Sequence, residues 1–159
     1  MNQLEKMPEL WAQRRSLDEP LTELVTLKHA RAAGCWRLEA GYLDLVGFGW
    51  ASDMPDEVSQ GFQDATRRVS LEQTGLGIVA AATTRLPAIA LRDPATTGLD
   101  RSASWIVKFD ANSSLAFPIF DARQQVIGVF AVSTRHSITA GDDLWQTLEQ
   151  LSLQLGQQG

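Results

Sequence analysis

Two apolar runs near the end of the chain constrain its fold more than any other feature. They are SSLAFPIF at 113–120 and VIGVFAVST at 126–134, separated by a mostly polar gap, DARQQ. Runs of this length that are rich in Val, Ile and Phe, with a polar gap of about five residues, are typical of a β-hairpin. In the second run the residues on both alternating faces are apolar, so neither face can be left in water. We therefore expect helices to cover one side of the hairpin and loops to cover the other, with any functional site beneath the loops.

Composition limits the class of protein and its partners. The chain has 159 residues, of which 44% are hydrophobic and 21% are charged, and this is typical of one globular domain. The net charge of −5 disfavours nucleic acid as a partner. The first residues, MNQLEKMPEL, lack the apolar core of an export signal, and no apolar run is long enough to span a membrane. The single cysteine, Cys35, excludes an internal disulfide and fits a reducing compartment, so we expect a cytoplasmic protein that binds neither nucleic acid nor a membrane.

The segments before the hairpin predict short helices and strands. Residues 1–16 have an amphipathic helical pattern, and we expect them to form an extension outside the core of a single domain at 17–159. Asp18 is placed to cap a second helix, and Gly34 is placed to end it. Further along we expect, in order, strands at 35–38 and 42–50, a helix at 56–65, a strand at 68–71, a helix at 78–82, a strand at 87–91 and one helical turn at 104–109.

The longest predicted loop, residues 93–103, is the best candidate for a binding site. It contains Pro, Gly, Thr and Ser without an apolar period, and long loops in compact domains are commonly lids or binding loops. Aromatic residues flank the segments that should cover the space below it, so a flat or apolar ligand could lie between rings and be oriented by polar side chains. The candidate ligand-binding residues are Trp50, Asp93, Thr97, Trp105, Phe109 and Ser114. The alternative is that the rings simply fill the core.

The end of the chain predicts a helix with one leucine face. Thr139 or Asp142 would cap this helix, and it would run to about Gln158. Its leucines are spaced by four, three and four residues, a pattern too short for an independent coiled coil but long enough to dock on a partner helix. We therefore expect a homodimer that forms through the terminal helices. The expected interface residues are Trp11, Leu144, Trp145, Leu148, Leu151 and Leu155.

The order of these elements resembles the GAF domain family over nearly the whole chain. The resemblance is carried by VSL at 69–71 with GLGIVAAA at 75–82, by PAIALRD at 87–93, and by SLAFPI at 114–119 with VIGVF at 126–130. It implies an α+β fold in which a central antiparallel sheet of five or six strands has the first and last helices on one face and a pocket, covered by loops and short helices, on the other. It also implies a sensor that binds a small molecule, dimerises and passes its state to an output domain. Because no output domain is seen in the sequence, we expect a stand-alone protein that acts on a separate partner.

Other chemistries have less support from the residues present. GLGIVA at 75–80 with Asp93 imitates a dinucleotide-binding motif, but the segment before it is too polar for a buried parallel strand and no further βαβ units follow. Small stand-alone proteins of the same family reduce free methionine sulfoxide, which needs an attacking and a resolving cysteine, whereas Cys35 is alone and we expect it to be buried. A covalently bound bilin would need a cysteine near the lid. KFD at 108–110 is similar to only part of a cyclic-nucleotide motif.

The remaining residues predict neither a metal site nor a catalytic group. His29 and His136 have no neighbouring Cys, His or Glu at the spacing of metal ligands, so we expect both to be structural or on the surface. No nucleophile with an adjacent base can be named, so we expect no enzyme activity and no cofactor. The leading interpretation is a regulatory sensor for an unidentified small molecule. The alternative is a ligand-free module for dimerisation or protein interaction.

Overall fold

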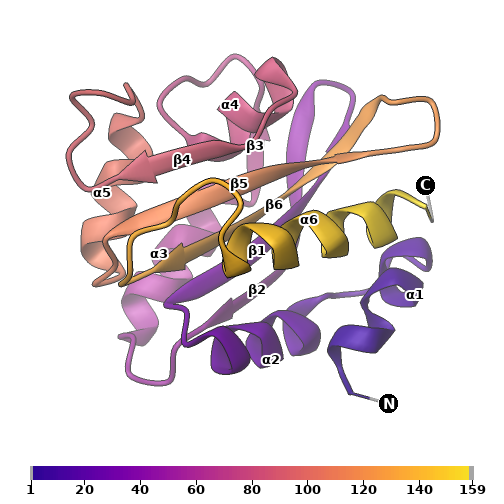
Figure 1. Cartoon of the computed structure of the whole chain (residues 1–159), viewed down its shortest axis with the longest axis horizontal. Coiled ribbons are helices and arrows are strands. Elements are labelled where there is room, and N and C mark those ends of the chain that lie inside the picture. The colour runs from indigo at the N-terminus through magenta and orange to yellow at the C-terminus, as the bar shows by residue number, and fades with distance from the viewer. Residues whose placement is uncertain (1, 158–159) are drawn as a thin grey trace.

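In the computed structural model, which describes residues 2–157, both predicted hairpins join one six-stranded antiparallel sheet (Figure 1). The strands are β1 (Ala32–Glu39), β2 (Tyr42–Trp50), β3 (Arg68–Ser70), β4 (Ala88–Leu91), β5 (Ser113–Phe120) and β6 (Val126–Thr134). They lie in the order β3-β2-β1-β6-β5-β4, so the two hairpins meet through β1 and β6 at the centre of the sheet. The expected α+β fold is confirmed.

Helices cover both faces of this sheet. They are a short 3-10 helix, η1 (Leu4–Lys6), and the α-helices α1 (Met7–Ala12), α2 (Asp18–Lys28), α3 (Asp56–Thr66), α4 (Gly77–Thr84), α5 (Asp100–Lys108) and α6 (Asp143–Gly156). Helices α1, α2 and α6 lie on the face turned to the viewer in Figure 1, whereas α3, α4 and α5 pack on the opposite face. The terminal helices therefore share one face, as expected.

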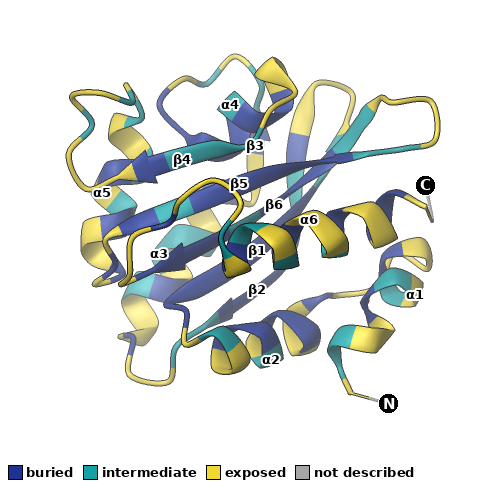
Figure 2. Cartoon of the chain, in the orientation of Figure 1, coloured by how far each residue is buried: buried dark blue, intermediate teal, exposed yellow. Residues whose placement is uncertain are grey.

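Alternate residues of the central strands belong to two separate cores. Cys35 and Phe130 lie in the core beneath α1, α2 and α6, whereas Trp36 and Val129 lie in the core beneath α4. Both faces of the hairpin strands are therefore buried, as their apolar alternation predicts (Figure 2). Strand β4 ends its pairing with β5 before Pro118, so this proline lies beside an open edge of β5, where a residue without an N–H is tolerated.

Helix α2 lies directly on strand β2 because two glycines leave room for it. A Cβ atom at Gly49 would lie 2.5 Å from the backbone nitrogen of Thr22, and one at Gly47 would lie 2.7 Å from Cβ of Leu17. Both distances are shorter than van der Waals contact. The backbone of α2 can therefore approach β2 this closely only where the strand carries glycine.

Two predictions about the ends of α2 are wrong. The helix ends just before His29, which has a left-handed conformation with φ 51°, rather than near Gly34. Gly34 lies within β1, where a Cβ atom would be 2.6 Å from the ring of Trp36. Asp18 does not cap the helix, because its Oδ1 accepts a hydrogen bond from the N–H of Phe48 on β2 at 2.8 Å.

The first helical segment packs in the core, contrary to the expected extension. Met7 is 0% exposed and Trp11 is 1% exposed, and both belong to the core beneath α2 and α6. Arg37 on β1 covers this contact from outside. It donates a hydrogen bond to the carbonyl of Trp11 at 2.6 Å, and its guanidinium lies 3.9 Å from the indole centroid. The apolar side of this segment therefore faces the core, and the prediction of an extension outside the core is wrong.

The ends of the later helices agree with expectation only in part. Asp142, one of the two expected caps, accepts a hydrogen bond from the N–H of Trp145 at the start of α6. This helix ends at Gly156, and the predicted end near Gln158 lies outside the described residues. Helix α5 begins at Asp100, so the longest predicted loop is shorter and the expected single turn is a nine-residue helix. Within residues 2–157, no helix has the length and apolar character needed to cross a bilayer.

Candidate functional site

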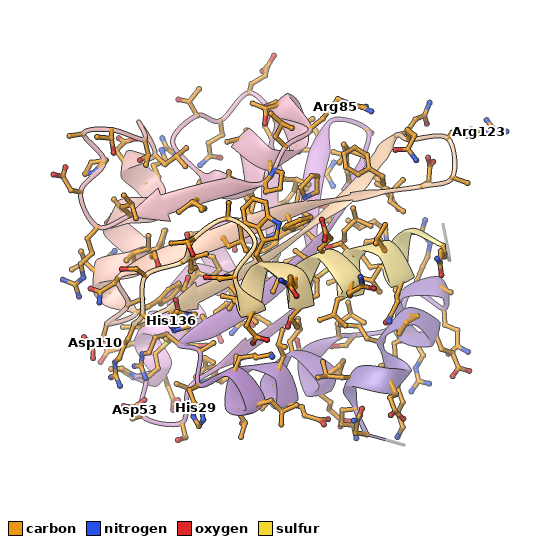
Figure 3. All side chains as sticks on the ribbon, in the orientation of Figure 1. His29, Asp53, Arg85, Asp110, Arg123 and His136 are labelled. Carbon is orange, nitrogen blue, oxygen red and sulfur yellow. The ribbon has the colours of Figure 1, made fainter. Side chains whose placement is uncertain are left out.

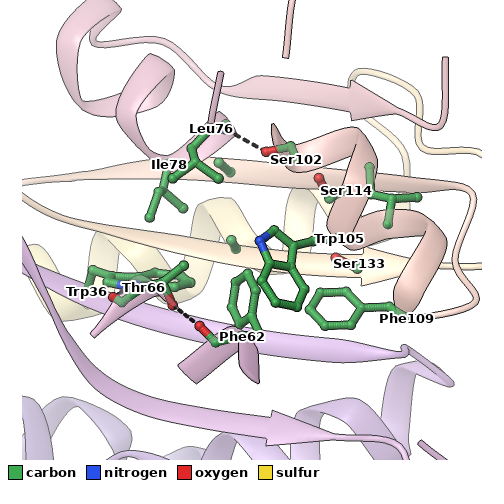
Figure 4. Close-up of a pocket in the computed structure, with 14 residues that line it drawn as sticks. Trp36, Phe62, Thr66, Leu76, Ile78, Ser102, Trp105, Phe109, Ser114 and Ser133 are labelled. Carbon is green, nitrogen blue, oxygen red and sulfur yellow. Dashed lines mark hydrogen bonds between the residues drawn. The ribbon is translucent and has the colours of Figure 1, made fainter. Parts of the chain in front are cut away.

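A small cavity lies between the sheet and helix α5. Its volume is about 50 Å³. That is enough for a few water molecules, because one water needs about 10–15 Å³ by the same measure. Its walls come from β1, α3, α4, α5, β5 and β6 (Figure 4). The site is therefore assembled from segments that are far apart in the sequence.

Aromatic rings fill most of the space around the cavity, and Phe62 of α3 lies at their centre. Its ring centroid is 5.0 Å from that of Phe109, 5.2 Å from those of Phe48 and Trp105, and 6.1 Å from that of Trp36. The contacts with Phe109, Trp105 and Trp36 have the edge-to-face geometry that aromatic pairs favour. The cavity is the space that these rings leave between α3, α5 and the sheet.

The polar side-chain groups of the lining residues are hydroxyls and the indole N–H groups of Trp36 and Trp105, and no charged side chain lines the cavity within the described part of the chain. The hydroxyl-bearing residues are Thr66, Ser102, Ser114 and Ser133. The Thr66 hydroxyl donates to the carbonyl of Phe62 at 2.8 Å, and the Ser102 hydroxyl accepts from the N–H of Gly77 at 2.8 Å (Figure 4). A neutral wall with hydroxyl groups can orient a ligand but cannot neutralise a charge on it.

Helix α5, which covers the cavity, is held at both ends. At its start, the N–H groups of Arg101 and Ser102 both donate to the carbonyl of Gly75 at 3.0 Å, while the Ser102 hydroxyl accepts the first N–H of α4. At its end, Nε of Arg31 on the loop before β1 donates to the carbonyl of Phe109 at 2.7 Å. The starts of α4 and α5 therefore satisfy each other's hydrogen-bonding groups. They resist separation, because pulling them apart would leave these groups without partners.

A cluster of ion pairs surrounds the C-terminal end of α5. Arg31 is only 5% exposed, and its Nη1 lies 2.6 Å from Asp53. Arg135 lies 2.6 Å from Asp110 and 3.7 Å from Asp53, and Figure 3 shows the two aspartates on the same side of the molecule. A hydrogen bond from Arg31 lowers the pKa of Asp53, and one from Arg135 lowers the pKa of Asp110. The cluster therefore ties the end of α5 to β1, β6 and the segment after β2.

The structure brings three of the six expected ligand-binding residues to the cavity. Those that line it are Trp105, Phe109 and Ser114. Trp50 lies outside, where its ring stacks on that of Phe48 with centroids 5.8 Å apart. Trp50 therefore packs against the aromatic cluster through Phe48 and does not line the cavity.

The other two expected residues, Asp93 and Thr97, lie in the loop before α5 and away from the cavity. Oδ1 of Asp93 accepts from the N–H of Ala95 at 2.9 Å, and Oγ1 of Thr97 accepts from the N–H of Leu99 at 3.2 Å. Each bond closes a local turn of the kind that Asp and Thr favour. These side chains stabilise the loop instead of facing the cavity.

The cavity is also lined by Trp36, Phe62, Ser102 and Ser133, which the sequence pattern did not indicate as site residues. Trp36 could have been found from alternation along β1, because neighbours in a strand point to opposite faces and Cys35 was expected in the core. Phe62 lies within the helix predicted at 56–65, but no local pattern shows which rings it meets. Ser102 was placed in a loop, since the start of α5 was predicted too late.

The leucine face of α6 packs on the sheet of its own chain. The buried members of the expected interface are Trp11, Leu144, Leu148 and Leu155. They present no surface to a partner, which corrects the role expected for these four. Trp145 packs edge-on against Phe117, with centroids 5.3 Å apart, and stays partly exposed, as does Leu151. Dimerisation itself stays a prediction, with Trp145 and Leu151 as the members that could still take part.

Cys35 lies on the face of the sheet opposite the cavity. It is fully buried in the core beneath α2 and α6, and burial raises the pKa of its thiol, because an apolar surrounding disfavours the thiolate. The expectation of a buried, small core residue is confirmed. Among the described residues there is also no group of three or more His, Cys, Asp or Glu side chains that could hold a metal ion.

Comparison with known proteins identifies the fold. A family model described as the GAF domain matches residues 16–158, and no curated protein matches the chain. Three similar solved structures are the GAF domain region of a putative membrane protein from Geobacter sulfurreducens PCA (16% identity, TM-score 0.68, covering 98% of this chain and 95% of that one), a putative GAF sensor protein from Burkholderia vietnamiensis (17%, 0.60, 99% and 90%) and a type II free methionine-R-sulfoxide reductase from Thermoplasma acidophilum (14%, 0.61, 96% and 94%). At these identities the likeness shows the fold alone.

Proposed function

The chain belongs to the GAF domain family, and on this premise we propose that it is a signalling sensor domain that binds a small molecule in the cavity beneath α5. The observation that carries the proposal is the cavity, whose walls are aromatic rings and hydroxyls and whose outer wall includes the partly exposed Trp105. Mostly apolar, concave sites with a few polar groups are the usual form of small-molecule sites.

The cavity in its present form is too small for such a ligand. Its volume of about 50 Å³ compares with about 300–1,000 Å³ for typical ligand pockets. A side chain must therefore move before a ligand can enter. Trp105 is the best candidate, because it lines the cavity, is partly exposed and projects from a helix whose backbone is tied at both ends. The structure then corresponds to the ligand-free, closed form of the sensor.

The remaining parts of the proposal concern the assembly and its setting. A cytoplasmic homodimer that signals to a separate output protein fits a chain with a free, buried thiol and exposed apolar groups on α6. Leu153 is 56% exposed there, and the partly exposed Trp145 and Leu151 lie on the same helix. Sedimentation of the purified protein tests the dimer, and a monomer at all concentrations would contradict it.

A thermal-shift screen with nucleotides, aromatic acids and oxoacids tests the ligand proposal. A ligand of this cavity should raise the Tm of the wild-type protein, and Trp105→Ala should change the size of that shift. Trp145→Ala is the matched control, because Trp145 is also partly exposed but lies on the opposite face of the sheet. If no compound raises the Tm of the wild-type or the Trp105→Ala protein, the sensor proposal is wrong.

The alternative function is a ligand-free module for protein interaction. The observation that favours it is the aromatic cluster around Phe62, which already occupies most of the space that a ligand would need. In that case the exposed face of α6 would be the working surface. A negative ligand screen together with dimerisation that is lost on Leu153→Lys would support this alternative over the sensor.

A reductase has less support than either, although three of the similar solved structures are of free methionine sulfoxide reductases. The only cysteine of the chain is buried on the face opposite the cavity, and burial raises the pKa of its thiol, so a thiolate is not available at the site. We therefore propose that the protein is not an enzyme. Turnover of methionine sulfoxide that disappears in a Cys35→Ser variant would contradict this.

A further inference from the structure

An open groove lies on the outer side of Trp105. It has a volume of about 230 Å³ and lies between the end of α3 and the outer surface of α5. The groove and the inner cavity share three lining residues, Thr66, Leu76 and Trp105. The indole of Trp105 is therefore part of the wall between them, and its displacement would join the two spaces.

The joined space would be large enough for a small aromatic molecule. The two volumes together approach the lower end, about 300 Å³, of typical ligand pockets. The place vacated by the indole adds a flat slot next to the edges of Phe62 and Phe109, whose centroids lie 5.2 and 6.0 Å from the Trp105 ring. A planar ring is the shape that packs against these two side chains in place of the indole.

The groove is basic, whereas the inner cavity is neutral. Arg101 and Lys108 line the groove, and no Asp or Glu lines it within the described residues. Both side chains are exposed, and neither forms an ion pair within residues 2–157, although the chain carries a net charge of −5. The two residues are seven positions apart on α5, so they lie on the same face as Trp105. Lys108 already contacts this ring, with its Nζ 4.3 Å from the centroid.

From this arrangement we propose that the ligand is a small planar aromatic carboxylate, with its ring in the place of the Trp105 indole and its carboxylate between Arg101 and Lys108 in the groove. The proposal rests on the proposed function, and it names the ligand class of that site. A carbocyclic or indole ring fits better than a nucleobase. Once the Trp105 indole is displaced, the inner wall offers only hydroxyls for the many polar edge groups of a base, because the indole N–H of Trp36 already donates to the carbonyl of Thr66 at 2.9 Å. The groove and the inner cavity share three lining residues, so the two cations of the groove lie close to the place of the ring. This also favours a ligand whose carboxylate is attached close to its ring.

Indole-3-acetate and its neutral amide, indole-3-acetamide, are the probes that test this. They share the ring and differ in charge, so isothermal titration of each against the wild-type protein isolates the contribution of the two cations. The acetate should bind at least about tenfold more tightly than the amide, since a hydrogen bond to a charged partner is worth at least a factor of this size. Its affinity should also fall with added salt, because the two cations are exposed.

Variants on the protein side make the same comparison. Arg101→Gln and Lys108→Gln should each weaken the acetate about two- to fivefold and leave the amide nearly unchanged, as expected for one exposed cation. Arg123→Gln is the matched control, because Arg123 is exposed, forms no ion pair within the described residues and lies at the tip of the β5–β6 hairpin, at the far end of the molecule from α5 (Figures 1 and 3). Trp105→Ala should tighten the binding of both probes, because the indole no longer competes for the slot.

The outcomes separate this inference from the function on which it rests. Equal binding of the acetate and the amide, with both affected by Trp105→Ala, would overturn the carboxylate proposal and leave the sensor intact. Binding that none of the variants alters would place the site elsewhere and overturn the inference. If neither probe binds the wild-type or the Trp105→Ala protein, the inference is also wrong, and the broad screen then decides whether the cavity binds a ligand of another class.

Discussion

Removal of the Phe62 ring tests whether the aromatic cluster stabilises the face of the sheet that carries the site. Phe62 has four ring neighbours, at centroid distances from 5.0 to 6.1 Å, and they come from β1, β2, α5 and the residue that follows α5. The substitution Phe62→Ala deletes all four contacts at once and enlarges the cavity that this ring lines. The loss should therefore appear in the stability of the whole domain.

The expected cost follows from burial and ring contacts. Fully buried Phe→Ala substitutions cost about 3–5 kcal/mol, from lost transfer free energy and the cavity left behind. Phe62 is only partly buried, which lowers the first contribution, while its edge-to-face pairs each add about 0.5–1.5 kcal/mol beyond area. We expect a loss of about 3 kcal/mol in the free energy of unfolding, or about 6–12 °C in Tm for a domain of this size.

Urea unfolding followed by circular dichroism measures this loss, with Phe120→Ala as the matched control. Phe120 is also partly buried, but its ring pairs with no other aromatic ring within residues 2–157 and makes a cation–π contact with the Arg85 guanidinium, 5.3 Å from the ring centroid. Its removal should cost about 1 kcal/mol, the centre of the distribution for point substitutions. If Phe62→Ala costs no more than Phe120→Ala, the rings do not form a cooperative core and the reasoning about the site is refuted.

Three further predictions concern the frame of the site. Gly49→Ala should destabilise the fold by about 1–3 kcal/mol, because its Cβ would collide with the backbone of α2. Gly61→Ala should instead stabilise α3 by about 0.5–1 kcal/mol, because its Cβ would lie 3.7 Å from the Trp105 ring and alanine favours a helix more than glycine does. Urea unfolding should give changes of opposite sign for the two variants. Cys35 should react with a thiol reagent only as fast as the domain unfolds, and rapid labelling of the native protein would show that it is accessible. A hydrogen bond from Arg135 lowers the pKa of Asp110 below 3.8. The ionised carboxylate of Asp110 therefore stabilises the fold above that pH, and this stabilisation is lost as the pH falls through the lowered, folded-state pKa. Asp110→Asn should therefore lower Tm at pH 7 and flatten its fall below about pH 4, and an unchanged Tm profile from pH 2 to 7 would contradict this.

Local patterns predicted well where a residue's environment depends on its neighbours in sequence. The alternation of apolar residues at 126–134 indicated a strand buried on both faces, and both cores are present. Ala40 and Gly41 at the turn of the first hairpin both have positive φ, as a two-residue turn requires. Asp142 was one of two residues predicted to cap the last helix, and it does so, because capping depends only on the next few residues.

Prediction failed where two distant segments compete for one position. Glycine is common at the end of a helix, but Gly34 lies within β1, where the ring of Trp36 leaves no room for a side chain. The leucines of α6 have the spacing of a docking face, but this face is buried against the sheet of the same chain and is not available to a partner. Neither outcome is visible in local sequence, because each depends on what packs against the segment.

The sequence by itself determined the sheet, its two-sided burial and the family, since hydrophobic alternation and turn chemistry act over a few residues and leave few alternative folds. Only the tertiary structure decided what the site is. Phe62, Trp105 and Trp36 meet because the chain crosses the same face of the sheet through α3 and α5, and the residual volume between rings depends on how side chains from distant segments pack. The same packing turned Asp93 and Thr97 away from the cavity and placed Arg101 and Lys108 beside it.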